Sequence, residues 1–398
     1  MALDGPGRPS EGKTLKAGGA RFDRGGNKGA LRSVTVRHTP TEREQNATLD
    51  GYPDQTEYEY YIPLDQVVRH IRDSGAKRVG LQFPNGLRDR AWEVAETVER
   101  HTDATAVVSG DLCFGACDLA DRDLVDMGVD LLVHFGHFEM PHVANQYKVP
   151  VLFVPVHTAM PLLPAAEAAL DHLKGKKVAV TTVAQHSDKL AGVLEYLEAS
   201  GVDCRTARGD ARLFTAGQVL GCNYSSAMAL ANEVDCFLYL GTGDFHPLGL
   251  AMSSDKPVIA ADPFTGEVRV FSDIRDRFIR RRWAAIAQAR DAETFGVLVS
   301  TKTGQMRTAQ ALRVKEELEK RGKRAHIIAL RDIVPDNLIW FRHLDAFVVA
   351  ACPRVPIDDQ ARFDKPLLTI QELKAVFDPE AGYIFDVIDP HNYVQPEF

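Results

Sequence analysis

Short apolar runs alternate with amphipathic stretches of helical length through most of the chain, and this order repeats three times. In each repeat, an apolar run is followed by a helix, a second run, a short helix and a third run. The first runs are Arg78–Phe83, Lys177–Val183 and Phe295–Ser300, and the third runs are Val129–Phe135, Val234–Leu240 and Leu344–Ala350. Short apolar strands between helices are typical of parallel βαβ units whose sheets are covered on both faces.

Three repeats on one chain predict three similar units. We expect an α/β fold of three βαβ domains with parallel sheets, in a pseudo-threefold arrangement around a common centre. The expected domains are residues 58–160, 161–290 and 291–398. Parallel crossovers are right-handed, so the strand ends of one unit open on the same edge. In open α/β sheets this edge is where ligands bind.

Residues 1–57 precede the repeats and lack their periodicity. The first 30 residues contain eight glycines and six Lys/Arg but almost no apolar pattern. Such a segment cannot bury enough surface to offset the entropy of ordering it. We therefore expect a disordered, basic, glycine-rich tail.

Composition narrows the class of protein. The chain has 398 residues, of which 45% are hydrophobic and 26% charged, as in an ordinary soluble protein. A net charge of −8 argues mildly against a nucleic-acid partner. The sequence contains no apolar run long enough to span a membrane and no apolar core of a secretory signal. We expect a cytoplasmic protein, in which the six cysteines are thiols rather than disulfides.

Three of the cysteines occupy loops at the expected binding edges, one in each repeat. Cys117 follows the second apolar run of the first repeat, Cys222 lies in the corresponding loop of the second, and Cys352 directly follows the last run of the third. A threefold metal site needs such an arrangement, although a single cysteine is more often a small buried hydrophobe. We expect that plain core role for Cys204 and Cys236, which lie inside apolar runs.

Cys113 forms a CxxxC pair with Cys117. No third cysteine follows at the spacing of the common radical S-adenosylmethionine enzymes, and structural zinc usually requires closely spaced CxxC-type pairs. We expect Cys113 to be a neighbour of the site rather than a ligand of it.

Six segments resemble the diphthamide-synthesis family of 2-(3-amino-3-carboxypropyl)histidine synthases. They are GDLCFGACDLAD, VDLLVHFGH, GQVLGCNYS, GTGDFHPLG, FGVLVSTKTGQ and ACPRVPIDD, and they occur in the family's order between about residues 58 and 375. The resemblance implies that Cys117, Cys222 and Cys352 hold a [4Fe–4S] cluster and that the protein forms a homodimer. One departure is Phe138-Glu139 after His137, where small or polar residues are more usual.

The resemblance also implies the reaction. The enzyme would transfer the 3-amino-3-carboxypropyl group of S-adenosylmethionine to C2 of a histidine in translation elongation factor 2, the first step of diphthamide biosynthesis. Three thiolates leave one iron of a [4Fe–4S] cluster without a protein ligand, so S-adenosylmethionine could bind there and accept one electron. The implied radical is 3-amino-3-carboxypropyl, and the by-product is 5′-methylthioadenosine. An electron donor is also implied, which the sequence does not identify.

Further polar residues fall on the same edge. The loop containing Gly241, Thr242, Gly243 and His246 follows an apolar run, and its backbone could approach an adenosine or a carboxylate closely. Lys302 and Gln305 follow the first run of the third repeat, and Lys302 could pair with the methionine carboxylate or simply be solvated. His134 and His137 flank a strand end, where ordinary hydrogen-bonded histidines are expected.

Other functions fit parts of the pattern. A quinolinate synthase-like condensing enzyme would also use three domains with one cysteine each. A non-catalytic partner would not need the intact cysteine triad, and a methyltransferase built on the GTGDFHP loop would need no iron. Formation of 5′-methylthioadenosine by an iron-containing protein would separate these alternatives.

Overall fold

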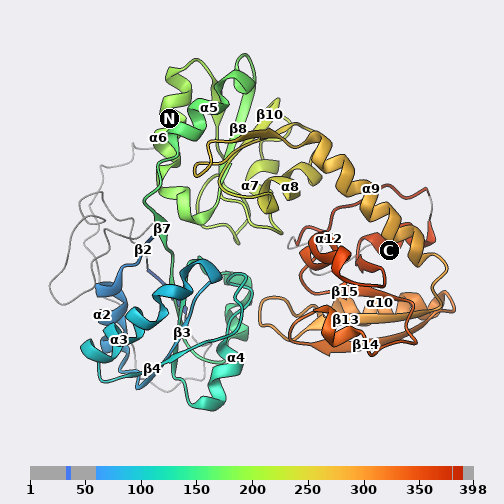
Figure 1. The fold of residues 1–398 in the computed structure, drawn as a ribbon, viewed down its shortest axis with the longest axis horizontal. Coiled ribbons are helices and arrows are strands. Elements are labelled where there is room, and N and C mark those ends of the chain that lie inside the picture. Colours follow the sequence, from blue (N-terminus) through green and yellow to red (C-terminus); the bar gives the residue numbers. More distant parts are fainter. Residues whose placement is uncertain (1–32, 37–59, 379, 389–398) are drawn as a thin grey trace, which may run out of the picture.

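The computed structural model describes residues 33–36, 60–378 and 380–388. These residues form three α/β units, each with its own sheet, which occupy the corners of a triangle (Figure 1). The blue-to-teal unit comes first in the chain, the green-to-yellow unit second and the orange-to-red unit third. The expected three-unit α/β fold is therefore confirmed.

The first sheet has the order β1-β6-β5-β3-β4, and all of its pairings are parallel. Alternate residues of β5 pack into different cores: Leu131 and Val133 contact the helix side of α2 and α3, and Leu132 packs on the side of α4. Because both faces are covered, the strand is apolar except for the buried His134. The elements of this sheet and its helices are β1 (Ser33–Thr35), β3 (Arg78–Gln82), β4 (Thr105–Val108), β5 (Leu131–Phe135), β6 (Val151–Val154), α2 (Leu64–Ser74), α3 (Ala91–His101) and α4 (Asp121–Leu124).

The second sheet repeats this order as β12-β11-β10-β8-β9, with only β12 antiparallel. The helices α5 and α6 cover one face, and α7 and α8 cover the other. The elements are β8 (Lys177–Thr182), β9 (Asp203–Arg205), β10 (Cys236–Leu240), β11 (Val258–Ala261), β12 (Val268–Val270), α5 (Leu163–Leu173), α6 (Leu190–Ala199), α7 (Ser225–Met228), α8 (Phe245–Met252) and α9 (Ser272–Ala289).

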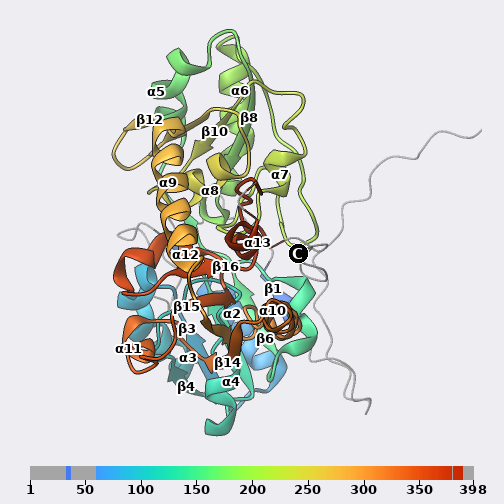
Figure 2. The same ribbon diagram turned by 90° about the vertical axis from the view of Figure 1, so that its right-hand side faces the viewer.

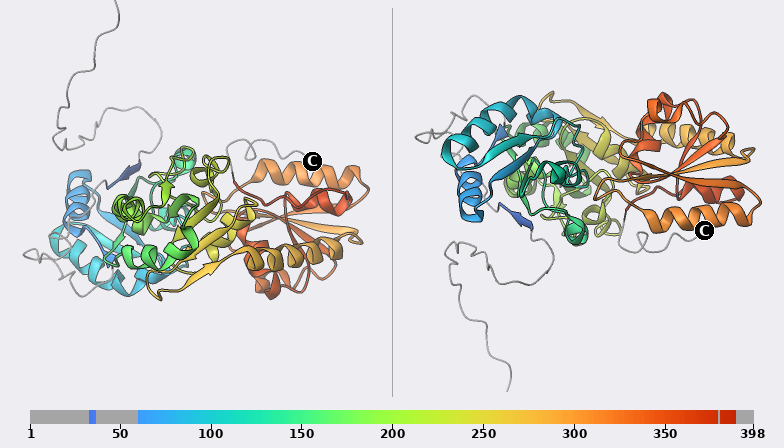
Figure 3. Two further views of the ribbon diagram at one scale, coloured as in Figure 1. Left: turned by 90° about the horizontal axis from the view of Figure 1, so that it is seen from above. Right: turned by 90° about the horizontal axis from the view of Figure 1, so that it is seen from below.

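The third sheet is parallel throughout, in the order β14-β13-β15-β16. Figure 3 shows helices on both of its faces. The elements are β13 (Thr294–Ser300), β14 (Arg324–Leu330), β15 (Ala346–Ala350), β16 (Leu367–Thr369), α10 (Thr308–Lys320), α11 (Pro335–Leu338), α12 (Arg354–Asp359) and α13 (Glu372–Phe377). Outside the three sheets, β2 (Tyr60–Tyr61) pairs with β7 (His157–Thr158) in an antiparallel ribbon.

The three sheets share one strand order. In each, the third apolar run of the repeat (β5, β10 or β15) lies between the first run (β3, β8 or β13) and a later strand (β6, β11 or β16). The second run (β4, β9 or β14) forms an edge strand every time. Equivalent loops of the three units therefore leave equivalent strand ends, as a threefold site requires.

The N-terminal prediction differs from the structure at one point. Residues 33–35 lie within the expected tail, yet they form β1, parallel to β6. The segment SVTV contains three consecutive β-branched residues, which suit a strand. The rest of residues 1–57 lies outside the described residues.

The helix α9 connects the second unit to the third, as the yellow-orange helix in Figure 1 and Figure 2 shows. Ile286 and Ala289 at its end pack into the core of the third unit. The buried Arg282 pairs with Glu372 at 2.7 Å and donates to the carbonyl oxygens of Pro356 and Leu367. The limits 58–160, 161–290 and 291–398 remain predictions, with α9 shared between two cores.

Among the helices in the described part of the chain, none has the length and apolar character needed to cross a membrane.

Candidate active site

The three loop cysteines come from three different units. Cys117 lies between β4 and α4, Cys222 lies three residues before the start of α7, and Cys352 lies between β15 and α12. Burial raises the pKa of the Cys117 thiol well above its usual range, and Cys352 and Cys222 raise it further. Since charges affect one another's pKa only over short distances in a protein, the fold brings together thiols that are 105 and 130 residues apart in sequence.

The sulfurs are not spaced for one metal ion. Among the described residues, only one group of three His, Cys or acidic side chains has ligand atoms all within 4.8 Å of one another, and Cys117, Cys222 and Cys352 are not that group. Thiolates around a single zinc ion would lie within about 4 Å of one another, whereas a cubane holds its thiolates about 6–7 Å apart. In this arrangement the three sulfurs therefore do not share a single ion.

The loop of Cys117 is fastened to the third unit. Gln305 Nε2 donates to Cys117 Sγ at 3.3 Å, and the Gly304 amide donates to the Cys117 carbonyl oxygen at 2.9 Å. A Cβ atom on residue 304 would lie 2.4 Å from Cys117 Cα, so only glycine fits there. The buried Lys302 ammonium group binds Asp118 at 2.8 Å and Asp332 at 2.7 Å.

The loop of Cys222 meets a different part of the third unit. The Ile388 amide donates to the Cys222 carbonyl oxygen at 3.0 Å. Two residues earlier, Asp386 pairs with Arg307 at 3.1 Å, and both side chains are completely buried. Burial and the neighbouring Cys352 raise the pKa of the Cys222 thiol to about 12, while Arg212 and Arg354 act in the opposite direction.

Cys352 sits at the start of α12. Burial raises the pKa of its thiol, whereas the backbone amide and the guanidinium group of Arg354 lower it in part. Arg354 is buried, forms a two-pronged ion pair with Asp358 at 2.8 Å and stacks over the Phe245 ring at 4.0 Å. Positive charge thus lies close to two of the three thiols, which favours their anionic form.

The loop with Gly241, Thr242, Gly243 and His246 runs into the start of α8, beside Arg354. Gly243 has a φ of 69°, the left-handed conformation that favours glycine. Burial lowers the pKa of His246 to about 3, and Arg354 and His137 lower it too. His246 is therefore a neutral imidazole, and Arg354 and His137 both lie near enough to affect its pKa.

The three cysteines remain a prediction from the sequence, which did not indicate several of the residues that contact their loops. Gln305 contacts a cysteine sulfur, whereas Lys302 has two carboxylate partners within the protein. Arg307 and Asp386 were missed because nothing in their local sequence marks them as neighbours of Cys222. Arg354 follows Cys352 by two residues, so its basic character next to a candidate ligand was an available signal.

Cys204 and Cys236 are buried in the second unit, with 6% and 0% of their surfaces exposed, as expected of core residues. Both belong to the hydrophobic cluster beneath α5 and α6. They lie on the sheet rather than in the cysteine-bearing loops, which leaves Cys117, Cys222 and Cys352 as the group that joins the units.

The fold and the site define a class: three-unit α/β proteins with one cysteine from each unit turned toward a shared centre. Residues 83–384 match the family model of diphthamide synthesis proteins. The chain belongs to this family.

Named relatives and a solved structure support the same family assignment. The chain is 41% identical, over 82% of its length and 93% of the relative, to 2-(3-amino-3-carboxypropyl)histidine synthase of Pyrococcus horikoshii. It is 31% identical to subunit 1 of the synthase of Caenorhabditis elegans, over 80% of each chain. It matches the crystal structure of Dph2 from Pyrococcus horikoshii with a 4Fe-4S cluster at a TM-score of 0.76 and 40% identity, over 82% of this chain and 93% of that one. The chain is an enzyme of the transferase class that these names describe.

Proposed function

We propose that this enzyme transfers the 3-amino-3-carboxypropyl group of S-adenosylmethionine to C2 of a histidine in translation elongation factor 2, with a [4Fe–4S] cluster held by Cys117, Cys222 and Cys352. The observation that carries the proposal is the meeting of three thiols from three units, each within electrostatic reach of another. The cluster in the related Pyrococcus structure supports the same cofactor.

The residues present fit such a cluster. Thiolates are its usual ligands, and three of them leave one iron open to a substrate. Arg212 and Arg354 oppose the rise in the pKa of Cys222, so they favour the thiolate that iron needs. Metal binding would release the thiol protons, because each of these pKa values lies above the usual range. When bound, a reduced cluster of this kind supplies one electron to a sulfonium ligand.

The chain's own residues would position S-adenosylmethionine. We assign this role to the loop of Gly241, Thr242, Gly243 and His246 and to Gln305, which reaches a cysteine sulfur. A neutral His246 can donate or accept a hydrogen bond without repelling the positive sulfonium. Lys302 would act indirectly. It would hold Asp118 next to Cys117 rather than bind the methionine carboxylate itself.

The proposal includes partners and a compartment. The protein substrate is elongation factor 2, a second copy of the chain completes a homodimer, and a separate electron donor reduces the cluster. We place the protein in the cytoplasm, where cysteines remain reduced, and expect no role for a membrane or for nucleic acid.

The test is a cysteine series under anaerobic reconstitution. Changing Cys117, Cys222 or Cys352 to Ala should remove most of the iron, the broad visible absorption and 5′-methylthioadenosine formation together. Cys204→Ala and Cys236→Ala should keep all three, since these thiols lie in the core of the second unit. A Cys352→Ala protein with a full cluster would refute the threefold site. Iron without 5′-methylthioadenosine would favour a quinolinate synthase-like enzyme or a non-catalytic partner.

A further inference from the structure

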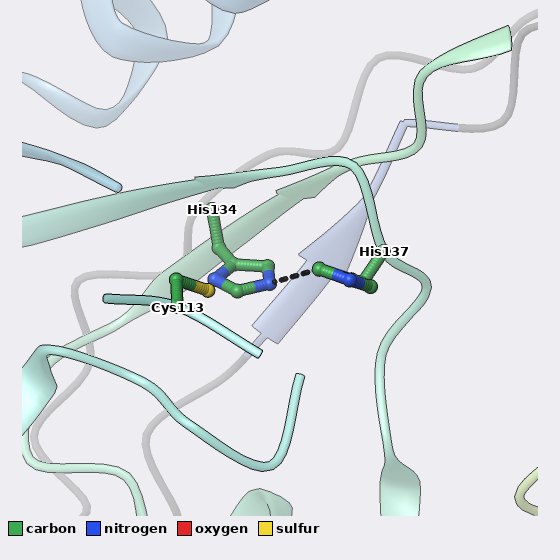
Figure 4. Close-up of side chains that lie close together, drawn as sticks. All are labelled: Cys113, His134 and His137. Atoms are coloured by element: carbon green, nitrogen blue, oxygen red, sulfur yellow. Dashed lines mark hydrogen bonds between the residues drawn. The ribbon is translucent and has the colours of Figure 1, made fainter. Parts of the chain in front are cut away.

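A second group of potential ligands lies in the first unit, next to Cys117 but without any of the three loop cysteines. Cys113 comes from the loop after β4, His134 from β5, and His137 from the turn that follows β5 (Figure 4). One ligand atom from each lies within 4.8 Å of the other two. The side chains of Cys113 and His134 are buried, and His137 is partly exposed. From the sequence alone, only ordinary hydrogen-bonded histidines are expected at positions 134 and 137.

Gln82 fixes which nitrogen of His134 carries the proton. Gln82 Nε2 donates to the Asp118 carbonyl oxygen at 2.7 Å, so its Oε1 must be the atom that accepts from the Ala120 amide at 3.1 Å. The same Oε1 lies 2.9 Å from His134 Nδ1, which must therefore be protonated. The lone pair of His134 Nε2 then points at His137 Nδ1, 3.0 Å away.

Protein ligands of a metal ion commonly show this arrangement. A histidine ligand usually donates its second ring N–H to a carbonyl or carboxylate, which orients the ring and sets its tautomer. Gln82 Oε1 serves that purpose here and is held in turn by two backbone groups. The hydrogen bond to His134 is thus present before any ion binds.

The ionisation states also suit a cation. Burial lowers the pKa of His134 well below its usual range and that of His137 to about 4, so both rings are neutral at pH 7. Burial, followed by Asp118, raises the pKa of the Cys113 thiol to about 12. The thiol would lose its proton to solvent when a metal binds.

We propose that Cys113, His134 and His137 form a second metal site, for a single zinc-like divalent cation. Zinc favours one thiolate and two imidazoles, at about 2.3 Å from sulfur and about 2.0–2.1 Å from nitrogen. The histidine pair needs only a tautomer change at His137, which moves its proton from Nδ1 to Nε2. His137 is the partly exposed member of the group, so we place the fourth coordination position on its side. The ion would tie the loop that carries Cys117 to β5.

Cobalt(II) chloride is the probe, because a thiolate ligand gives cobalt a charge-transfer band in the near ultraviolet. The protein is the full chain with Cys117, Cys222 and Cys352 all changed to Ala, so that no cluster ligand remains. We expect one cobalt per chain with this band. Adding Cys113→Ser should abolish the band, and adding Gln82→Leu should weaken cobalt binding about 10–100-fold. Adding Cys204→Ser is the matched control and should change neither.

A folded cluster-free protein without the band, or with a band that survives Cys113→Ser, would overturn the proposal. Circular dichroism establishes folding. If the triple variant does not fold, the metal content of the reconstituted parent decides: about one zinc per chain beside the iron, absent from Cys113→Ser, supports the site, and no zinc refutes it. Neither readout requires methyl-thioadenosine formation or iron, so failure of this site and failure of the proposed reaction are distinguishable.

Discussion

Cys117 and Cys222 both lie in loops that the third unit contacts, but the contacts differ in number and kind. Four consecutive residues, 302–305, bond the Cys117 segment by an ion pair, a hydroxyl, a backbone amide and a side-chain amide. The carbonyl oxygen of Cys222 instead accepts one backbone hydrogen bond, from Ile388 near the chain's C-terminal end. We call residues 302–305, which contact the Cys117 segment, the seam. We call residues 385–388, which contact Cys222 and the second unit, the strap.

Arg307 shows how the two contacts are joined. It lies two residues after the seam and pairs with Asp386, two residues before Ile388 in the strap. Phe385 of the strap also packs in the core of the second unit near Tyr224. The segment 302–307 therefore reaches both cysteine loops, directly at Cys117 and through the strap at Cys222. A change in residues 302–305 should displace Cys117, whereas a change in residues 385–388 should mainly loosen the loop of Cys222.

The largest effect should come from Gly304→Ala. The new Cβ would fall 2.4 Å from Cys117 Cα and 3.0 Å from its carbonyl oxygen, which are backbone atoms that cannot rotate away. Cys117 must then move, and we expect loss of most of the iron after anaerobic reconstitution. Gly192→Ala is the control, because nothing lies within 4 Å of its Cβ position in α6. Wild-type iron content in Gly304→Ala would show that the seam does not position the ligand.

The next largest effect should come from Lys302→Met. The change leaves Asp118, whose side chain is 0% exposed, without its closest cation. Leaving one charge of a buried pair uncompensated costs about 3–5 kcal/mol, and Arg331 at 3.8 Å offsets part of that here. Thermal unfolding should report the loss. The double variant Lys302→Met with Asp118→Asn should recover part of it, and equal melting temperatures for the single and double variants would contradict the assigned pairing.

A smaller effect on iron is expected at the strap. Asp386→Asn removes the negative partner of Arg307 but preserves the side chain's shape, so the pair is weakened without a cavity. Because Arg307 keeps a buried charge without its anionic partner, we expect stability to fall by about 3–5 kcal/mol, and a cluster that forms but is lost faster in air. Asp336→Asn, on the partly exposed α11, is the matched control. Equally fast cluster loss in Asp336→Asn would show that the effect does not arise from the Arg307–Asp386 pair.

Strands and loops could be predicted from the sequence, whereas the contacts of the seam and the strap between units could not. The repeated apolar runs predicted the strands and the loops between them, because the periodicity of a strand or helix depends on neighbouring residues in the sequence. The position of one cysteine in a loop of each unit could therefore also be read from the sequence. The strap was not predicted, since Asp386 and Cys222 are far apart in sequence and no period links them. From the sequence, Lys302 was expected to pair with a substrate or to be solvated. In the structure its partners are Asp118, in the first unit, and Asp332, which follows β14 of the third unit. Pairings of this kind depend on how whole units dock.

The smallest effect should be electronic, at Gln305. Its Nε2–H group donates to Cys117 Sγ at 3.3 Å, and a hydrogen bond to a cluster thiolate stabilises the more negative, reduced state. Gln305→Leu removes that donor but keeps the apolar part of the side chain. A net hydrogen bond of about 1 kcal/mol corresponds to about 40 mV for one electron, so the reduction potential should fall by roughly that amount while the iron content remains near that of the parent. Gln310→Leu, buried on α10, is the control and should leave the potential unchanged. An unchanged potential in Gln305→Leu would mean that the seam holds Cys117 in place without tuning it, and an equal fall in both variants would assign the effect to packing rather than to the donor.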